Sequence, residues 1–260
     1  MRVLIIGAGK MVDALLSGLR PDEHDYFIFS PSGISAKALA EKHSINYLTA
    51  PFIDSPDIVM LGHKPQQLRD VAEVLKGKFP ESIFASLLAA VDEKNQLESL
   101  YVKKLVRVMP NLSVGVKKGV TLLSSLSVDS DEMQILKRWL SPTGICVEVN
   151  ETQLDELTLL TGCGPALFFQ FAFNVSKCFE TLSLDETLKL TAQVMIGSSD
   201  LINKYDGKFS KAIQDVASKG GVTEAILKSW NEGRFFDEIR NGIDAGKIKT
   251  QMIKDSLPRK

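Results

Sequence analysis

The stretch VLIIGAGKMVDALLSGL, residues 3–19, joins a short apolar run to a helical pattern through Gly7-Ala8-Gly9. Residues 3–6 predict a buried strand, and the apolar positions along 11–19 predict one face of a helix. A glycine turn between a strand and a helix presents backbone N–H groups to the pyrophosphate of a dinucleotide. Val12 replaces the third small residue of this fingerprint, so we expect the helix to sit slightly further from its strand. The alternative is a purely structural turn, but the position between strand and helix favours a nucleotide site.

Strand-like and helix-like segments alternate over the first half of the chain. Strands are predicted at 3–6, 26–29, 57–61, 83–87 and 105–108, and helices at 11–19, 35–43, 67–75 and 92–100. This alternation is typical of a doubly wound parallel sheet of the Rossmann type.

From about residue 150 only helix periodicity remains. Helices are predicted at 151–160, 166–182, 185–205, 223–233 and 235–255. Residues 166–178 are apolar on nearly every face, which indicates burial against a second chain. We therefore expect an α/β fold in which a Rossmann-type doubly wound sheet, 1–150, is followed by an all-helical dimerisation and substrate domain, 151–260.

Composition and charge limit the setting and the partners. The formal net charge of −1 gives no reason to expect nucleic acid or an anionic membrane as a partner. The three cysteines, Cys146, Cys163 and Cys178, suggest neither disulfides nor a metal site. No apolar stretch reaches the roughly 18 residues of a membrane helix, and no signal peptide precedes the first strand. We expect a cytoplasmic protein with a solvated basic tail at 254–260.

The tip of the second predicted strand bears on the choice of nucleotide. An Asp or Glu there would bind a free ribose 2′-hydroxyl, but this chain has Ser30-Pro31-Ser32-Gly33. The hydroxyls of Ser30 and Ser32 can donate to a 2′-phosphate, and Lys37 lies one helical turn later. NADPH is therefore the expected cofactor, and NADH is a possible second one. The alternative is that residues 30–33 are a simple turn between strand and helix with no role at the nucleotide.

Five short segments, spread in order over nearly the whole chain, resemble the pyrroline-5-carboxylate reductase family. They are GAGKM (7–11), LGHKPQ (61–66, against the family's Ala-Val-Lys-Pro-Gln), RVMPN (107–111), ELTLLTGCGPALFF (156–169) and DVASKGGVTEAI (215–226). The resemblance implies a Rossmann domain and a helical domain that dimerises by interleaving, with an active site completed in part by the second subunit. It implies NADPH-dependent hydride transfer to the cyclic imine 1-pyrroline-5-carboxylate, giving L-proline, in a homodimer or a dimer-based assembly.

The resemblance also implies roles for single residues. With Ser30 and Ser32, the residues expected at the cofactor are Gly7, Gly9, Lys10, Met11, Lys64, Pro65, Met109, Pro110 and Asn111. The residues expected at the small cyclic imino acid are Gly162, Gly164, Pro165, Ser218, Lys219, Gly220, Gly221 and Thr223. Thr223, whose hydroxyl would reach the ring nitrogen, and Lys64, beside the nicotinamide, are the expected catalytic residues.

Departures from the family pattern keep other functions open. Cys163, Leu167 and Lys219 replace the family's Ser, Tyr and Pro close to the proposed substrate. His63 replaces Val beside Lys64, either as a packed side chain or as an acid. The alternatives are a reductase of a related cyclic imine or ketimine and a non-catalytic nucleotide-binding paralogue.

Overall fold

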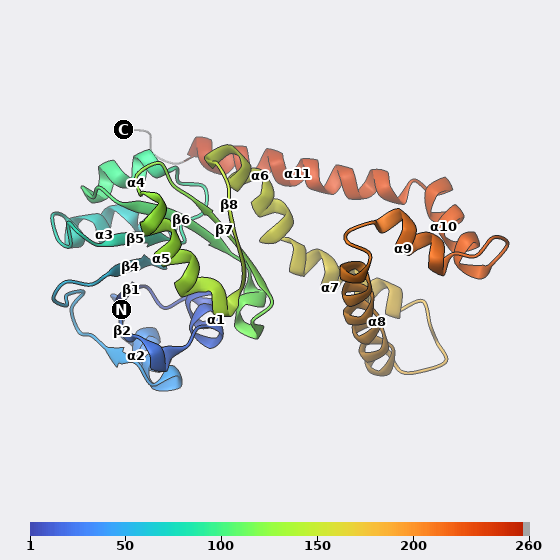
Figure 1. Ribbon diagram of the computed structural model, residues 1–260, viewed down its shortest axis with the longest axis horizontal. Helices are drawn as coiled ribbons and strands as arrows, with labels where there is room; N and C mark the ends of the chain where they lie inside the picture. Colours follow the sequence, from blue (N-terminus) through green and yellow to red (C-terminus); the bar gives the residue numbers. More distant parts are fainter. Residues whose placement is uncertain (257–260) are drawn as a thin grey trace. The chain divides into compact units, whose positions relative to one another are not determined.

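The computed structural model describes residues 1–256 and divides by contacts into two units (Figure 1). The first unit is Met1–Pro165 with Lys249–Lys260, and the second is Ala166–Ile248. Helix α6 (Glu151–Thr161) therefore belongs by contacts with the sheet, and α11 (Phe235–Ser256) begins in the second unit and ends in the first. The division of the sequence near residue 150 stays a prediction. Of the predicted solvated tail, residues 257–260 lie outside the described residues.

The first unit contains one eight-stranded sheet in the order β3-β2-β1-β4-β5-β6-β7-β8. The strands are β1 (Arg2–Ile6), β2 (Asp25–Phe29), β3 (Asn46–Tyr47), β4 (Ile58–Leu61), β5 (Ile83–Ser86), β6 (Leu105–Pro110), β7 (Gly119–Ser124) and β8 (Gly144–Glu148). The first six strands are parallel, and the chain order reverses between β1 and β4. This arrangement confirms the predicted Rossmann-type sheet.

Strand β7 departs from the predicted parallel arrangement, because it runs antiparallel to β6, whereas β8 is parallel to β7. The connection from β6 to β7 is 111–118, which holds only a short 3-10 turn, Leu112–Val116. A parallel neighbour needs a crossover of about a dozen residues or more, so this connection reverses the chain instead. The segment 109–150, to which no element was assigned from the sequence, supplies β7, α5 (Ser130–Leu140) and β8.

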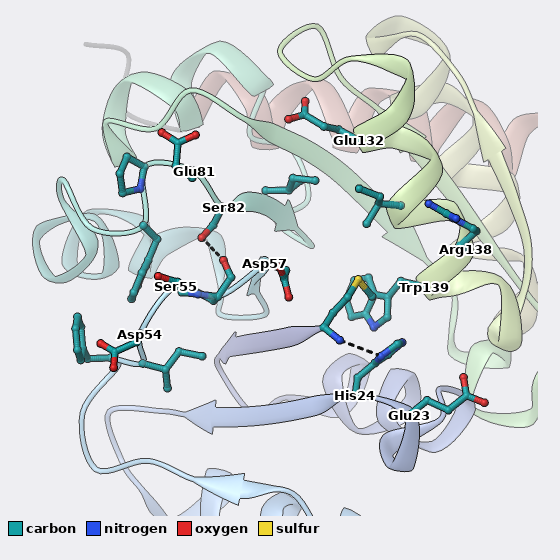
Figure 2. A pocket seen from close by; sticks show the side chains of 18 residues that line it. Glu23, His24, Asp54, Ser55, Asp57, Glu81, Ser82, Glu132, Arg138 and Trp139 are labelled. Atoms are coloured by element: carbon teal, nitrogen blue, oxygen red, sulfur yellow. Dashed lines mark hydrogen bonds between the residues drawn. The ribbon is translucent and has the colours of Figure 1, made fainter.

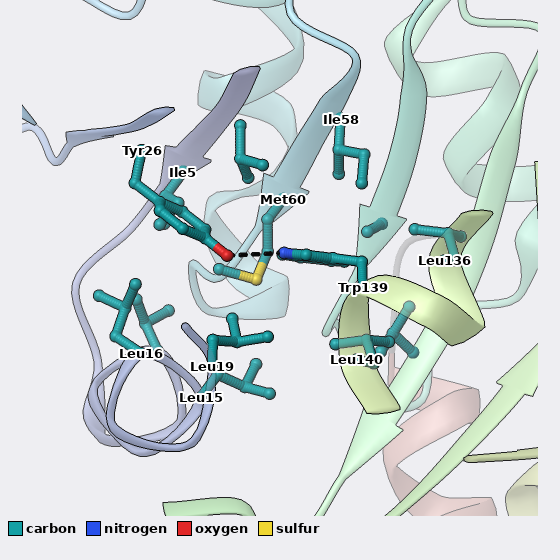
Figure 3. Close-up of a cluster of buried hydrophobic side chains, with 14 of the residues drawn as sticks. Ile5, Leu15, Leu16, Leu19, Tyr26, Ile58, Met60, Leu136, Trp139 and Leu140 are labelled. Carbon is teal, nitrogen blue, oxygen red and sulfur yellow. Dashed lines mark hydrogen bonds between the residues drawn. The ribbon is translucent and has the colours of Figure 1, made fainter. Parts of the chain in front are cut away.

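Helices cover both faces of the sheet, as the alternation predicts. Helices α1 (Lys10–Gly18), α2 (Ile34–His43) and α5 pack on one face, and α3 (Leu68–Leu75) and α4 (Glu93–Leu100) on the other. In the core between the sheet and α1, α2 and α5, Trp139 Nε1 donates a hydrogen bond of 2.8 Å to Tyr26 Oη (Figure 3). Burial raises the pKa of Tyr26 to about 12, so this bond joins two neutral side chains across the core.

The second unit is helical. Its helices are the later part of α7 (Gly164–Ser176), α8 (Leu184–Lys204), α9 (Phe209–Val216), α10 (Val222–Glu232) and the first part of α11. Helix α7 ends at Ser176, six residues before the predicted end at 182, and α9 was not predicted. Remaining short turns of 3-10 helix lie at Pro21–Glu23, Pro65–Gln67 and Ser141–Thr143.

The helical stretch Glu151–Ser176 corrects the expectation that no apolar segment reaches membrane-spanning length. It is long and apolar enough by length and composition alone, with a mean hydropathy of 1.2, and 6% of the qualifying window is buried. A helix that packs against a second subunit has the same composition, so this observation is weak support for a membrane segment.

Candidate functional site

The glycine turn lies where the strand order reverses, between the carboxyl ends of β1 and β4. Gly7 has a φ of +114°, and a Cβ at Gly7 would lie 2.5 Å from the carbonyl carbon of Gly62. The backbones that follow β1 and β4 therefore touch, which only glycine at position 7 permits. This contact brings the glycine turn beside the segment that contains Lys64 and Pro65. Ligands of open α/β sheets bind in the crevice at this point.

The start of α1 is open on the side that a nucleotide would use. Gly9 is the N-cap of α1, no side chain caps it, and Gly9 and Lys10 are exposed. A Cβ at Gly9 would meet nothing closer than Gly62 O at 3.9 Å, so the fold itself does not require glycine there. The helix N-terminus and the bare glycine form a cradle for a pyrophosphate, and a nicotinamide dinucleotide fits these residues. Met11, half-buried in the first turn, packs against the core instead.

At the tip of β2, the two serines predicted to contact the nucleotide differ in exposure. Ser30 is buried, and its Oγ lies 3.3 Å from Ser35 Oγ. Gly33, with a φ of +68°, starts α2, while Ser32 and Lys37 are exposed on either side of it. Ser32 and Lys37 are therefore free to contact a phosphate, whereas the hydroxyl of Ser30 is used within the turn.

His63 and Lys64, which follow the end of β4, lie in different environments. His63 Nδ1 donates to the carbonyl oxygen of Lys64 at 3.0 Å, so its Nε2 is an acceptor. Nε2 is buried without a hydrogen-bond partner among residues 1–256, and burial lowers the pKa of His63. His63 is thus a neutral ring near neutral pH, which favours the packed side chain over the acid. Lys64 is exposed, and its backbone N–H donates to Gln67 Oε1 at 3.0 Å.

Met109 and Pro110 end β6 at the same edge of the sheet, Asn111 follows directly, and all three are buried. Asn111 Nδ2 donates to the carbonyl oxygen of Thr161 at 3.0 Å, and its Oδ1 accepts from Val120 N–H at 3.2 Å. Its amide therefore fixes the end of α6, directly before the predicted substrate residues Gly162, Gly164 and Pro165. Of these, Gly162 is exposed and Gly164 is buried.

A charged network that the sequence analysis did not recognise holds the other end of α6. Arg107, fully buried in β6, forms ion pairs with Glu151 at 2.5 Å and with Asp155 at 3.3 Å. Lys254, near the end of α11, also pairs with Asp155, which corrects the expectation of a solvated tail at that residue. The sequence did contain a signal for this network, because an arginine lies inside the otherwise apolar strand LVRVMP and a buried charge needs a partner.

The remaining predicted substrate residues form one loop in the second unit, before α10. Gly221 N–H donates to the carbonyl oxygen of Ser218 at 2.9 Å, and Gly220 has a φ of +73°. Ser218, Lys219 and Gly220 are exposed, and Thr223 is half-buried in the first turn of α10. Gly220 N–H donates to Glu224 Oε2 at 2.6 Å. The sequence analysis did not name Glu224, which this contact brings to the predicted substrate loop.

A hollow of about 1040 Å³ contains none of the predicted site residues (Figure 2). Met1, Asp57 and Ile83 in its wall lie at the amino ends of β1, β4 and β5, the edge opposite to the glycine turn. Its volume therefore does not mark the nucleotide site.

Comparison with known proteins covers both parts of the chain. Residues 151–252 match the family model described as pyrroline-5-carboxylate reductase dimerisation, and residues 2–90 match that described as NADP oxidoreductase coenzyme F420-dependent. The chain is 27% identical to pyrroline-5-carboxylate reductase 2 of Bacillus subtilis (strain 168), covering 98% of this chain and 96% of the relative. It is 28% identical to the pyrroline-5-carboxylate reductase of Staphylococcus aureus (strain COL), covering 98% and 100%.

Among solved structures, the 1-pyrroline-5-carboxylate reductase of Streptococcus pyogenes is similar over the whole length. The TM-score is 0.87 at 25% identity, and the match covers 99% of each chain.

Proposed function

Because this chain belongs to the pyrroline-5-carboxylate reductase family, we propose that it reduces 1-pyrroline-5-carboxylate to L-proline with NADPH. The observation that carries this proposal is the full-length likeness, which spans the cofactor fold and the helical domain together. The bare glycine cradle at α1 supports it, since an oxidoreductase of this fold needs an open helix N-terminus for its nucleotide.

The nucleotide-binding edge supplies binding and orientation. When bound, NADPH provides the hydride for the reaction. The first turn of α1, from Gly9, would hold the pyrophosphate, and Ser32 and Lys37 would bind the 2′-phosphate. Lys64 and Pro65, at the end of β4, would border the nicotinamide and fix its face towards the substrate.

The loop before α10 supplies the substrate contacts. The backbone N–H of Gly220, in the glycine turn before α10, would hold the carboxylate of the imino acid, since a glycine turn at a helix start forms an anion-binding nest. The N–H of Gly221, also predicted at the substrate, is bound to the carbonyl oxygen of Ser218 instead. The Thr223 hydroxyl would contact the ring nitrogen. The imine carbon gains the hydride and the nitrogen ends protonated, so the C=N bond becomes the C–N bond of proline and no strong base is needed.

We propose that the working protein is a cytoplasmic homodimer or an assembly of dimers. Large apolar side chains are exposed on the single chain, for example Phe168 at 58% and Phe169 at 72%. Their exposure supports a second copy that covers α7, since monomeric proteins rarely expose large contiguous apolar patches. Sedimentation of the purified protein at low micromolar concentration should show no folded monomer. A stable monomer with full activity would contradict this assembly.

The activity is tested by following NADPH oxidation with 1-pyrroline-5-carboxylate and, separately, with the six-membered cyclic imine. We expect a higher kcat/KM for the five-membered substrate and for NADPH over NADH. Ser32→Asp should reverse the cofactor preference, because a carboxylate repels the 2′-phosphate and binds the free 2′-hydroxyl. Oxidation with the six-membered imine alone would indicate a related ketimine reductase. No oxidation with either would leave a nucleotide-binding paralogue.

A further inference from the structure

The loop Ser218–Thr223 already holds a carboxylate that belongs to the protein. Glu224, in the first turn of α10, turns back so that its Oε2 accepts the N–H of Gly220 at 2.6 Å. We infer that Glu224 competes with the substrate's carboxylate for the Gly220 N–H and thereby weakens the binding of every carboxylate ligand that uses this N–H. This inference rests on the proposed function, which assigns the same N–H group to the substrate.

Two carboxylates cannot share this position. The Gly220 backbone offers one N–H, and a second anion beside Glu224 is repelled by a like charge at close range. A substrate carboxylate must therefore displace Glu224 before it reaches Gly220. The displacement requires no change in the fold, because Glu224 and Gly220 are both exposed and the side chain can rotate into solvent.

The competition weakens every ligand that needs the Gly220 N–H by the same factor. An internal carboxylate is present at a high effective concentration, so a small external carboxylate that makes no other contact binds weakly. A cyclic imino acid makes further contacts through its ring and nitrogen, and these offset the cost of displacement. Glu224 thus raises KM for the imino acid and weakens acetate binding alike.

The alternative is that Glu224 only caps the start of α10. Another glutamate of this chain caps a helix in the same way and serves as a control. In α8, Glu186 Oε2 accepts the backbone N–H of Ser183 at 3.0 Å, in the same unit and outside the glycine loop. If Glu224 only caps α10, Glu224→Gln and Glu186→Gln should both change stability slightly and leave substrate binding alone.

The experiment measures KM and kcat with 1-pyrroline-5-carboxylate for the wild type, Glu224→Gln, Glu224→Ala and Glu186→Gln. We expect both Glu224 variants to lower KM by about three- to tenfold, as for loss of one exposed charge-assisted contact. KM for NADPH should not change, and Glu186→Gln should match the wild type. Inhibition by pyrrolidine-2-carboxylate should strengthen in the Glu224 variants, whereas inhibition by pyrrolidine, which has no acceptor for the Gly220 N–H, should stay constant. An unchanged or raised KM in both Glu224 variants overturns the inference.

A binding measurement separates this inference from the proposed function. Acetate titrated calorimetrically should bind more tightly to Glu224→Gln than to the wild type, whether or not any imine is reduced. A wild type that reduces neither imine defeats the proposed function alone. Equal acetate affinities in an active enzyme defeat the inference alone.

Discussion

The side chain of Val12 occupies the space that a side chain at position 62 would need. A Cβ on Gly62 would lie 2.3 Å from Val12 Cγ2, and Val12 is fully buried. The glycine fingerprint calls for a small residue at position 12, and the missing side chain at Gly62 leaves the space that Val12 fills. The expectation that α1 sits slightly further from its strand stays a prediction.

Gly62→Ala should destabilise the fold by about 1–3 kcal/mol, because the new methyl group overpacks against Val12. Val12→Ala should also destabilise it, by about 2 kcal/mol, because it leaves a cavity. The double variant should cost less than the sum of the two changes. Urea unfolding of the four proteins gives the coupling energy. If the two changes in the free energy of unfolding are strictly additive, the side chains at positions 12 and 62 do not compete for the same space.

Arg107→Ala should destabilise the protein by about 3–5 kcal/mol, since it leaves the carboxylates of Glu151 and Asp155 without their buried cation. Lys254→Ala should cost about 1 kcal/mol or less, because this lysine is partly exposed and Asp155 keeps Arg107. Urea unfolding compares the two variants. Equal costs would mean that Lys254 of α11 contributes as much to the network as Arg107 of β6, which would contradict this prediction.

The free energy of unfolding should fall between about pH 7.5 and about pH 5.5 in part because of His63. Burial lowers the pKa of His63 below its ordinary value of 6.5, so the unfolded chain binds the proton first. The stability that depends on the neutral ring is fully present above pH 6.5 and is lost as the pH falls, by at most about 1.4 kcal/mol per pH unit. His63→Val should show a shallower fall in urea unfolding at the same two pH values. An identical slope in the variant would contradict this origin.

Lys219→Ala should raise KM for 1-pyrroline-5-carboxylate several-fold and leave KM for NADPH unchanged. Lys219 is exposed directly beside Gly220, where it adds a cation near the proposed carboxylate position. Its effect is opposite in sign to that expected of Glu224→Gln. Lys219→Arg keeps the charge and should retain most of the affinity. If KM is the same in Lys219→Ala, the lysine faces solvent and the backbone alone binds the carboxylate.

The sequence predicted the sheet well where its strands alternate with helices, and less well where they do not. Strands β1, β2, β4, β5 and β6 are apolar runs between turn signals and were identified. Strand β7 lies beyond a short connection and reverses direction, which local patterns do not reveal. Helix α5 did carry a signal, because Asp129 and Glu132 form a capping box at its start.

The turns of the candidate site were predictable from the sequence, since glycines mark positions of positive φ such as Gly7 and Gly220. The side-chain contacts of the site were not. The burial of Ser30, the use of the Asn111 amide on Thr161 and the capture of Gly220 by Glu224 depend on distances that no motif records. Each of these contacts changes which predicted residue is free to meet a ligand.

The return of α11 to the first unit places a constraint on biosynthesis. Lys254 and its partner Asp155 are 99 residues apart, so about 5–20 seconds of translation separate their synthesis. During that time Arg107 alone compensates Asp155, and the sheet must form around an ion network that still lacks one member. A ribosome that stalls within the helical unit therefore leaves a nascent chain whose nucleotide-binding fold is nearly complete but lacks the ion pair between Lys254 and Asp155.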